Sequence, residues 1–315
     1  MQKLEYENEK RYREIFAAVG LCKSNLVFPV FVSDRPYGIE SMPGMLVTRV
    51  EKITHRVQVI VDAGIQSLIV FGIPKSRDRR GSSAYDGKGV VQRAVRAIKS
   101  GFGSSVNVVT DVCVCQYNLS GHCGVVSGSR VDNDATLRVL GEIATSHAEA
   151  GADVVAPSSM MDGQVSAIKS ALAHFTTKTM ILSYSAKHAS SLYTPFRSVA
   201  FAKTRSRLDK SSYQVSCANP RQALLEIETD INEGADMVMI KPALAYLDLV
   251  RMVKDRFGYP VAVQNVSGEY AMIKAAAMRG LVDEEEWKVC SVASIKRAGA
   301  DRIISYFALD VAKYL

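Results

Sequence analysis

The 315-residue sequence predicts an α/β protein, a (β/α)8 TIM barrel with a short N-terminal arm. Eight short runs rich in Val, Ile and Met lack polar alternation, which is typical of parallel strands buried on both faces. Helical patterns separate these runs, and a glycine recurs between a helix and the next run. Eight parallel strands connected in this way most simply close into a barrel.

Polar residues, glycine or proline bound each predicted strand. In chain order the strands are NLVFPVFV from Asn25, SLIVFGI from Ser67, VNVVTDVCV from Val106, DVVAPS from Asp153, TMILSYSA from Thr179, DMVMIKP from Asp236, PVAVQNVS from Pro260 and DRIISYFA from Asp301. The predicted helices between them include GVVQRAVRAIKS, ATLRVLGEIATSHAEA, RQALLEIETDINE, YLDLVRMVKDRF and EEWKVCSVASIKRA. Residues 1–24 are charged and helix-prone, and we expect them to form an arm outside a catalytic barrel spanning residues 25–315.

The segments DAGIQSLIVFG, EAGADVVAPS, EGADMVMIKP and RAGADRIISY indicate one αβ turn used four times. Their glycines, Gly64, Gly151, Gly234 and Gly299, stand where a helix ends, and glycine is the usual residue there. The main alternative is a doubly wound sheet. That fold would carry a glycine-rich phosphate loop after a strand, and the sequence contains no GxGxxG motif.

Composition favours a globular cytoplasmic protein, with 48% hydrophobic and 23% charged residues. No apolar run approaches the roughly 18 residues of a membrane span, and the first residues are too charged for a signal peptide. The net charge of +7 is modest. Basic runs without interleaved aromatic residues argue against nucleic acid as a partner.

Two lysines are the first candidates for chemistry. Lys241 ends the apolar run MVMIKP, and Lys187 follows the neighbouring run in SYSAKHAS. Poor hydration lowers a lysine pKa, and we expect each ammonium to lower the pKa of the other. Neutral amines form Schiff bases with ketones. The alternative is that both side chains extend into solvent at the barrel mouth.

Three cysteines, Cys113, Cys115 and Cys123, lie at C-x-C-x7-C spacing after the third predicted strand. Three thiolate ligands with an open fourth position are typical of a catalytic zinc site. Buried free thiols remain the alternative. Asp111, just before them, is a candidate for proton transfer or for holding a lysine.

A long basic segment follows the fifth predicted strand and contains Arg197, Arg205, Arg207 and Lys210. Arginine binds carboxylates through paired hydrogen bonds, so these cations are candidates for binding an acidic substrate. The alternative is a solvated basic loop. A charged segment of this length is also typical of a lid.

From about Asn25 to Leu315 the chain resembles the porphobilinogen synthase (5-aminolevulinate dehydratase) family. The resemblance rests on motifs in order: SMPGM, FGIP, DVCVCQYNLSGHCG, VDNDATL, GADVVAPSSMMDGQV, SYSAKHASSLYTPFR, YQ at Tyr213, GADMVMIKPALAYLD, VSGEYAMIK and AGADRIISYFALD. It implies a (β/α)8 barrel that joins two molecules of 5-aminolevulinate, with loss of two waters, into porphobilinogen for tetrapyrrole and heme biosynthesis.

The resemblance also implies roles for single residues. Lys241 would form the Schiff base with the propionate-side substrate and Lys187 with the acetate-side substrate, and zinc would lie on the three cysteines. The substrate-binding positions would be Ser267 and Tyr306 for one carboxylate, Arg197, Lys210 and Gln214 for the other, and Ser158 for bound substrate. Glu226 lies where some members bind an allosteric magnesium.

Several positions depart from the family pattern. Lys210 replaces an arginine, Gln264 stands where tyrosine is usual, Ser159 is uncommon, and YNLSGHCG replaces YTSHGHCG. The arm is short, whereas in the family it wraps a neighbour and supports homo-oligomeric octamers. Two further functions therefore stay open: a divergent lysine Schiff-base aldolase or dehydratase acting on another keto acid, and a non-catalytic paralogue.

Overall fold

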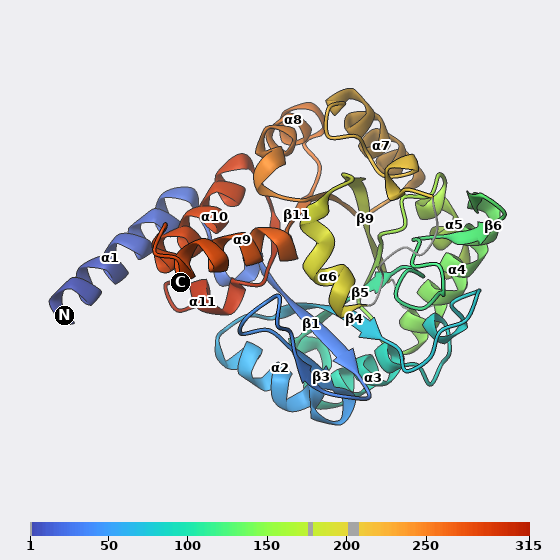
Figure 1. Cartoon of the computed structure of the whole chain (residues 1–315), viewed down its shortest axis with the longest axis horizontal. Helices are drawn as coiled ribbons and strands as arrows, with labels where there is room; N and C mark the ends of the chain where they lie inside the picture. The colour runs from blue at the N-terminus through green and yellow to red at the C-terminus, as the bar shows by residue number, and fades with distance from the viewer. Residues whose placement is uncertain (1, 176–178, 201–207) are drawn as a thin grey trace.

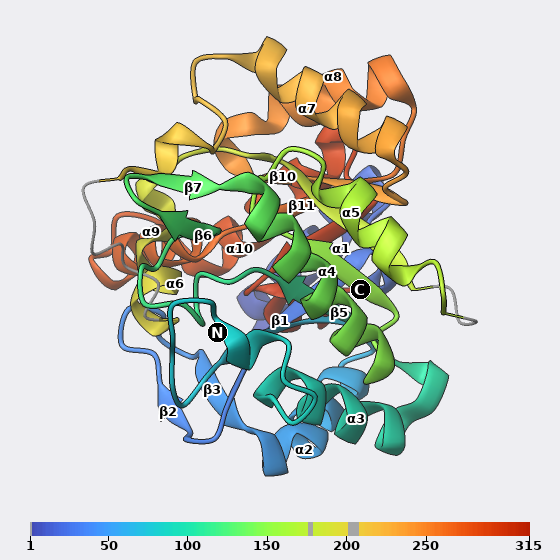
Figure 2. The ribbon, with the colours of Figure 1, turned by 90° about the vertical axis from the view of Figure 1, so that its right-hand side faces the viewer.

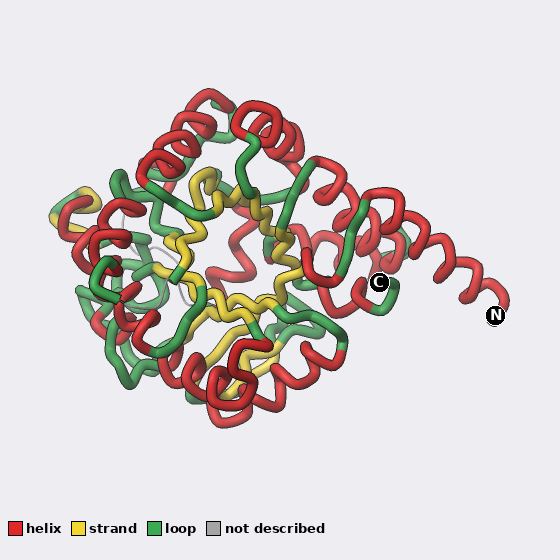
Figure 3. The backbone as a smooth tube through the Cα atoms, turned by 180° about the vertical axis from the view of Figure 1, so that it is seen from behind, coloured by secondary structure: helices red, strands yellow, loops and turns green. Residues whose placement is uncertain are grey.

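A closed ring of eight parallel strands forms the centre of the protein in the computed structural model, which describes residues 2–175, 179–200 and 208–315. The strands are β1 (Leu26–Ser33), β4 (Ser67–Ile73), β5 (Asn107–Val112), β8 (Val154–Pro157), β9 (Met180–Lys187), β10 (Met237–Lys241), β11 (Val261–Asn265) and β12 (Arg302–Ser305). Pairing of β12 with β1 closes the ring, seen end-on in Figure 3. The predicted barrel and all eight strands are confirmed.

Helices surround the strands and bury their apolar faces against them (Figure 1). They are α2 (Ile53–Asp62), α3 (Val90–Phe102), α4 (Asn133–Glu149), α5 (Gln164–Leu172), α7 (Pro220–Glu233), α8 (Leu247–Phe257), α9 (Ser267–Met278), α10 (Glu284–Ala298) and α11 (Ala308–Ala312). In α3, for example, Val91, Ala94, Val95 and Ile98 are buried at helical spacing. The five helices predicted from the sequence are among them. None of the described helices is long and apolar enough to cross a membrane.

The repeated αβ turn is confirmed by backbone geometry. Gly64, Gly151, Gly234 and Gly299 have φ values of 84°, 100°, 97° and 121°. Residues with a Cβ rarely adopt this region, so glycine suits the position where the chain turns from helix to strand. These turns return the chain to the barrel wall, and the strands then run toward a shared mouth.

The N-terminal helix α1 (Gln2–Val19) extends away from the barrel, with the N-terminus at its far end (Figure 1). Its second half is attached to the body, because Tyr12 and Phe16 are buried and Tyr12 makes an edge-on contact with Tyr314, with ring centroids 5.1 Å apart. A separate arm over residues 1–24 stays a prediction.

Short elements that the sequence did not predict surround the mouth. Tyr37–Gly38 (β2) pairs with Leu46–Arg49 (β3), and Val125–Ser127 (β6) forms a hairpin with Arg130–Asp132 (β7). A short helix of six residues, α6 (Thr194–Val199), follows β9. In Figure 2, α6 and the β6–β7 hairpin lie on the same side of the barrel, and this side holds the candidate site.

Candidate active site

Lys187 and Lys241 are the last residues of the neighbouring strands β9 and β10, and their Cα positions pair directly in the parallel register. Both side chains are buried. Both line one pocket at the carboxyl ends of the strands, where the reaction face of a barrel lies. The two predicted lysines are therefore adjacent.

Three aromatic rings enclose the amine of Lys241. The Nζ atom lies 5.2 Å from the ring centroids of Tyr184 and Tyr193 and 5.6 Å from that of Phe196. Burial lowers the pKa of Lys241 to about 7, and the positive charge of Lys187 contributes to the same shift. A substantial fraction of this amine is therefore neutral, and nucleophilic, near neutral pH.

Lys187 has a different environment. Its Nζ donates a hydrogen bond to the carbonyl oxygen of Ser158 and lies 3.8 Å from the Sγ atom of Cys123. Burial lowers its pKa, but electrostatic interactions with the thiol cluster, Cys123 foremost, and with Asp111 outweigh burial and raise the pKa overall. The expectation that both lysines have lowered pKa values is therefore wrong for Lys187, because a thiol cluster lies beside it.

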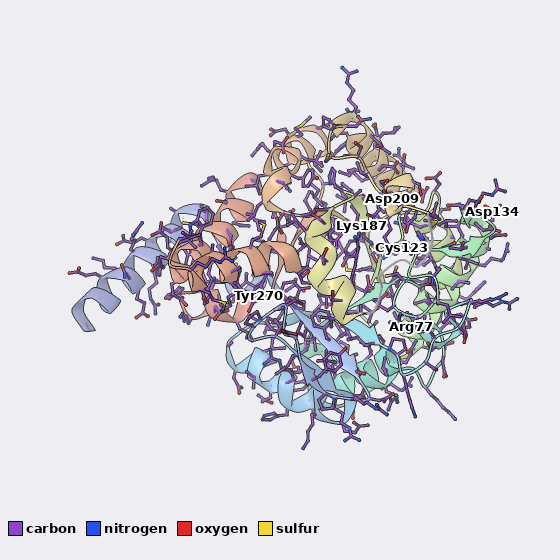
Figure 4. All side chains as sticks on the ribbon, in the orientation of Figure 1. Arg77, Cys123, Asp134, Lys187, Asp209 and Tyr270 are labelled. Atoms are coloured by element: carbon purple, nitrogen blue, oxygen red, sulfur yellow. The ribbon has the colours of Figure 1, made fainter. Side chains whose placement is uncertain are left out.

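The Sγ atoms of Cys113, Cys115 and Cys123 lie within 4.8 Å of one another, and all three residues are buried. In the part of the chain that the structure describes, they make up the one group of His, Cys, Asp or Glu side chains with this geometry. Figure 4 shows Cys123 close to Lys187 inside the ring of helices. Three converging sulfur donors match the donor set that a soft metal ion such as zinc prefers.

The loop between Cys115 and Cys123 is shaped by Asn118. Its Oδ1 accepts a 2.7 Å hydrogen bond from the Gly121 N–H, and its Nδ2 donates to the His122 carbonyl at 2.9 Å. The Cys123 N–H donates to the Tyr213 hydroxyl at 3.2 Å. These bonds fold the loop back and bring Cys123 to the other two cysteines.

The three thiols do not titrate alike. Burial raises the pKa of Cys113 to about 11. The pKa of Cys123 is lowered well below its usual value, first because Cys113 and Cys115 donate hydrogen bonds to it, and also because Lys187 and Lys210 are near. Of the three thiols, Cys123 is therefore the one whose surroundings favour the thiolate, and it is the one that lies beside the cations.

Asp111 lies at the base of the pocket and accepts two side-chain hydrogen bonds, from Ser158 Oγ at 2.7 Å and from Gln116 Nε2 at 2.9 Å. Burial raises its pKa. Among the described residues the carboxylate forms no ion pair with a lysine. Its hydrogen bond with the Ser158 hydroxyl orients Ser158, whose carbonyl oxygen accepts from Lys187. Gln116 was not among the residues singled out from the sequence.

The predicted carboxylate-binding residues Arg197, Lys210 and Gln214 also line the pocket. Arg197 comes from α6 and stacks over the ring of Tyr193 at 5.3 Å. Lys210 Nζ lies 3.9 Å from Cys123 Sγ. Arg205 and Arg207 fall outside the described residues. One pocket therefore combines amines, thiols and cations, a suitable set for a small acidic ketone.

Ser267 and Tyr306 do not line this pocket as the structure describes it. Ser267 is buried beneath α6, where its Oγ accepts from the Phe196 N–H at 3.1 Å and donates to the Leu192 carbonyl at 3.3 Å. Tyr306 is buried and stacks on Phe31. The α6 segment covers Ser267, and Tyr306 packs against Phe31 and Tyr270, so their predicted contact with a carboxylate stays a prediction.

Comparisons with known proteins identify the family of the chain. The family model described as delta-aminolevulinic acid dehydratase matches residues 2–314. The chain belongs to the delta-aminolevulinic acid dehydratase family. A relative of that name from Archaeoglobus fulgidus is 48% identical over 96% of this chain and 94% of its own length, and one from Bacillus subtilis is 43% identical over 97% and 95%.

A solved structure of a delta-aminolevulinic acid dehydratase (porphobilinogen synthase) from Toxoplasma gondii ME49 is also similar. It superposes with a TM-score of 0.91 and 37% identity, covering 94% of this chain and 86% of that one. That protein was solved in complex with its reaction product, porphobilinogen. Both the barrel and the family expected from the sequence motifs are thus confirmed.

Glu269 is a buried residue that was not predicted from the sequence. Its carboxylate accepts from the N–H groups of Ala243 and Leu244, just after Lys241, and from the Val266 N–H and Asn265 Nδ2. Glu269 therefore ties the ends of β10 and β11 together. A carboxylate in the first turn of a helix, in VSGEY, is the signal that could have indicated it.

Three further sequence candidates differ in their surroundings. Gln264 and Ser159 are buried, and the Gln264 Oε1 and Ser159 Oγ atoms have no hydrogen-bond partner among the described residues. Glu226 lies in α7, where burial and the charges of Asp162 and Asp230 raise its pKa. The described residues place Glu226 in no group of three metal-ligating side chains.

Proposed function

We propose that this protein is a porphobilinogen synthase that condenses two 5-aminolevulinate molecules through Schiff bases at Lys241 and Lys187. The observation that carries the proposal is the pairing of two buried amines at adjacent strand ends, in one pocket with three thiols. Two amines allow both ketone substrates to be held covalently side by side. Their adjacency turns a reaction between two molecules into one within a single complex.

Lys241 has the stronger case as a nucleophile. Because its pKa is about 7, the amine attacks a ketone carbon without first losing a tightly held proton. Lys187 is the amine nearer the thiols and is held by the Ser158 carbonyl. Binding of substrate at Lys187 would need this hydrogen bond to break, and Asp111 keeps Ser158 in place meanwhile.

Each substrate also carries a carboxylate. Arg197, Lys210 and Gln214 line the same pocket as the two lysines and suit one carboxylate. The second would bind near Ser267 and Tyr306. For this, the Ser267 hydroxyl must give up its present partners, because it accepts a hydrogen bond from the Phe196 N–H of α6 and donates one to the Leu192 carbonyl just before α6.

Zinc is the proposed cofactor, and Cys113, Cys115 and Cys123 would hold it. Three buried sulfur donors within 4.8 Å fit such an ion and leave a coordination position free. When bound, zinc supplies a Lewis acid that polarises an oxygen of the substrate. Lys187 and Lys210, both within 4 Å of Cys123, balance part of the thiolate charge.

Other features belong to the same proposal. A cytoplasmic homo-oligomer, an octamer in the family, is consistent with the helix α1, which projects from the barrel (Figure 1). Magnesium near Glu226 would act at a distance from the mouth, on α7. Both parts are separable from the reaction itself.

The test is to incubate the purified protein with 5-aminolevulinate and zinc under reducing conditions and to assay for pyrrole. We expect porphobilinogen from the wild type and none from a Lys241→Met control. Imines are then trapped with borohydride in the presence of other keto acids. Trapping that prefers another ketone, with no pyrrole formed, would replace this proposal by a different lysine-dependent reaction, and no trapping with any ketone would indicate a non-catalytic paralogue.

A further inference from the structure

Tyr184 is a fully buried tyrosine in β9 whose hydroxyl has no hydrogen-bond partner among the described residues. Its side chain is among the largest that the protein buries completely. Burying a hydroxyl without a partner is unfavourable, since the bond to water is lost and nothing replaces it. Tyr184 packs beside Lys241, a residue that lines the pocket, so its unpaired hydroxyl calls for an explanation other than packing.

The strand register shows that Tyr184 faces the barrel interior. Ser183 points outward, since its Oγ donates to Asp230 of α7 at 2.6 Å. Neighbouring residues of a strand point to opposite faces, so Tyr184 points inward. The register between β9 and β10 then shifts by one residue before Ala186, which lets Lys187 point inward as well.

The ring of Tyr184 lies against the reactive amine. Lys241 Nζ is 5.2 Å from the ring centroid, and Asp111, Tyr306 and Cys113 are near enough to influence the phenol electrostatically. Burial raises the pKa of Tyr184 well above its usual value, so the hydroxyl keeps its proton. It is a neutral donor on a ring that packs beside the Lys241 amine.

We infer that the Tyr184 hydroxyl donates a hydrogen bond to the ketone oxygen of the substrate that Lys241 attacks. The inference rests on the proposed Schiff-base function. As the N–C bond forms, the C=O electron pair moves to the oxygen, and a donor aimed there stabilises the developing charge. The C–O bond then breaks, and the oxygen leaves as water with one proton from the amine and one from solvent, so Tyr184 transfers none.

The test uses Tyr184→Phe, which keeps the ring and removes only the unpaired hydroxyl. We expect the melting temperature to stay equal or rise, because no hydrogen bond is lost. We expect kcat to fall by roughly 10² and the rate of borohydride trapping of 5-aminolevulinate on Lys241, followed by peptide mass spectrometry, to fall in parallel. The control is Tyr259→Phe, which removes a hydroxyl that donates to the Ala235 carbonyl far from the mouth, and which should lower stability and leave kcat unchanged.

The outcomes distinguish the role of the Tyr184 hydroxyl from the proposed Schiff-base function. Wild-type activity together with unchanged trapping in Tyr184→Phe would overturn the role of this hydroxyl and leave the proposed function standing. Absence of trapping in the wild type would overturn both. A fall in kcat without a fall in the trapping rate would also contradict the inference, since the hydroxyl would then act after imine formation.

Discussion

Lys187 and Lys241 occupy directly paired positions at the ends of β9 and β10, yet their pKa values shift in opposite directions. Lys241 faces three aromatic rings, and Lys187 faces Cys123. The pKa values of the two adjacent amines therefore differ because one lies among aromatic rings and the other beside a thiol. Lys241 is expected to lose its proton at a lower pH than Lys187.

The first prediction concerns the pH dependence of imine formation at Lys241. Because its pKa is about 7, the neutral fraction of the amine rises as pH increases through 7. The rate of borohydride trapping at saturating 5-aminolevulinate should rise with a midpoint near pH 7 and level off above pH 8. A midpoint above pH 9 would mean that burial does not lower the pKa of this lysine.

The second prediction concerns Lys241→Met, which keeps the length of the side chain and removes the amine. Turnover should fall by at least about 10³-fold, because methionine forms no imine.

In the wild type the unfolded chain binds more protons than the folded chain between pH 7 and about 10.4, so this lysine makes the free energy of unfolding rise with pH in that window.

The same variant therefore has a stability readout. Chemical denaturation at pH 6 and pH 10 should show Lys241→Met gaining more stability over the wild type at pH 6, where the buried amine is charged. Retained turnover would remove Lys241 from the mechanism. Equal gains at both pH values would contradict the lowered pKa.

The third prediction concerns the thiol cluster. Cys123→Ala should lower zinc affinity by at least about 100-fold and lower turnover with it, because one of three ligands is lost. Metal content after dialysis and circular dichroism are the measurements, and Cys217→Ala, at an exposed cysteine, is the control. An unfolded Cys123→Ala protein would show that the cluster is structural.

The strands were predictable because residues buried on both faces give continuous apolar runs, and the αβ turns because they require a positive φ. Lys241 could be predicted as a reactive amine because its ammonium ends the apolar run MVMIKP. The direction of the Lys187 pKa shift was not, because it depends on a loop that Asn118 folds back to bring Cys123 within 3.8 Å.

Local irregularities limited the rest. Tyr184 and Lys187 are three residues apart, so strict alternation along β9 would place them on opposite faces. The one-residue register shift between β9 and β10 lets both face the interior. Glu269 accepts hydrogen bonds from four groups at two strand ends. Its place in the first helical turn of VSGEY indicates the bond from the Val266 N–H, but nothing in the sequence indicates the bonds from the Ala243 and Leu244 N–H groups. Contacts of this kind depend on the tertiary fold.

The fourth prediction concerns Lys210→Arg. Lys210 is buried, lines the pocket and lies 3.9 Å from Cys123 Sγ, so its charge is already directed at the site. A guanidinium can bind a carboxylate with two parallel hydrogen bonds, and an ammonium acts as a point charge. The KM for 5-aminolevulinate should fall about 3- to 10-fold with kcat little changed. Lys88→Arg, at an exposed lysine, is the control, and an unchanged KM would place the carboxylate clamp elsewhere.

The fifth prediction concerns Gly268, which lets α9 approach the segment that carries α6. A Cβ at this position would overlap the backbone of Leu192, so Gly268→Ala must push that segment outward. The shift would break the hydrogen bonds of Ser267 Oγ with Phe196 and Leu192 and move Phe196 away from Lys241. We expect stability to fall by about 1–3 kcal/mol, as for other overpacked sites, and turnover to fall with it.

Gly87→Ala, where a Cβ meets nothing within 4 Å, is the control. The measurements are thermal melts and steady-state kinetics on both variants. If Gly268→Ala has the melting temperature and turnover of the wild type, the contact between α9 and the α6 segment does not stabilise the pocket.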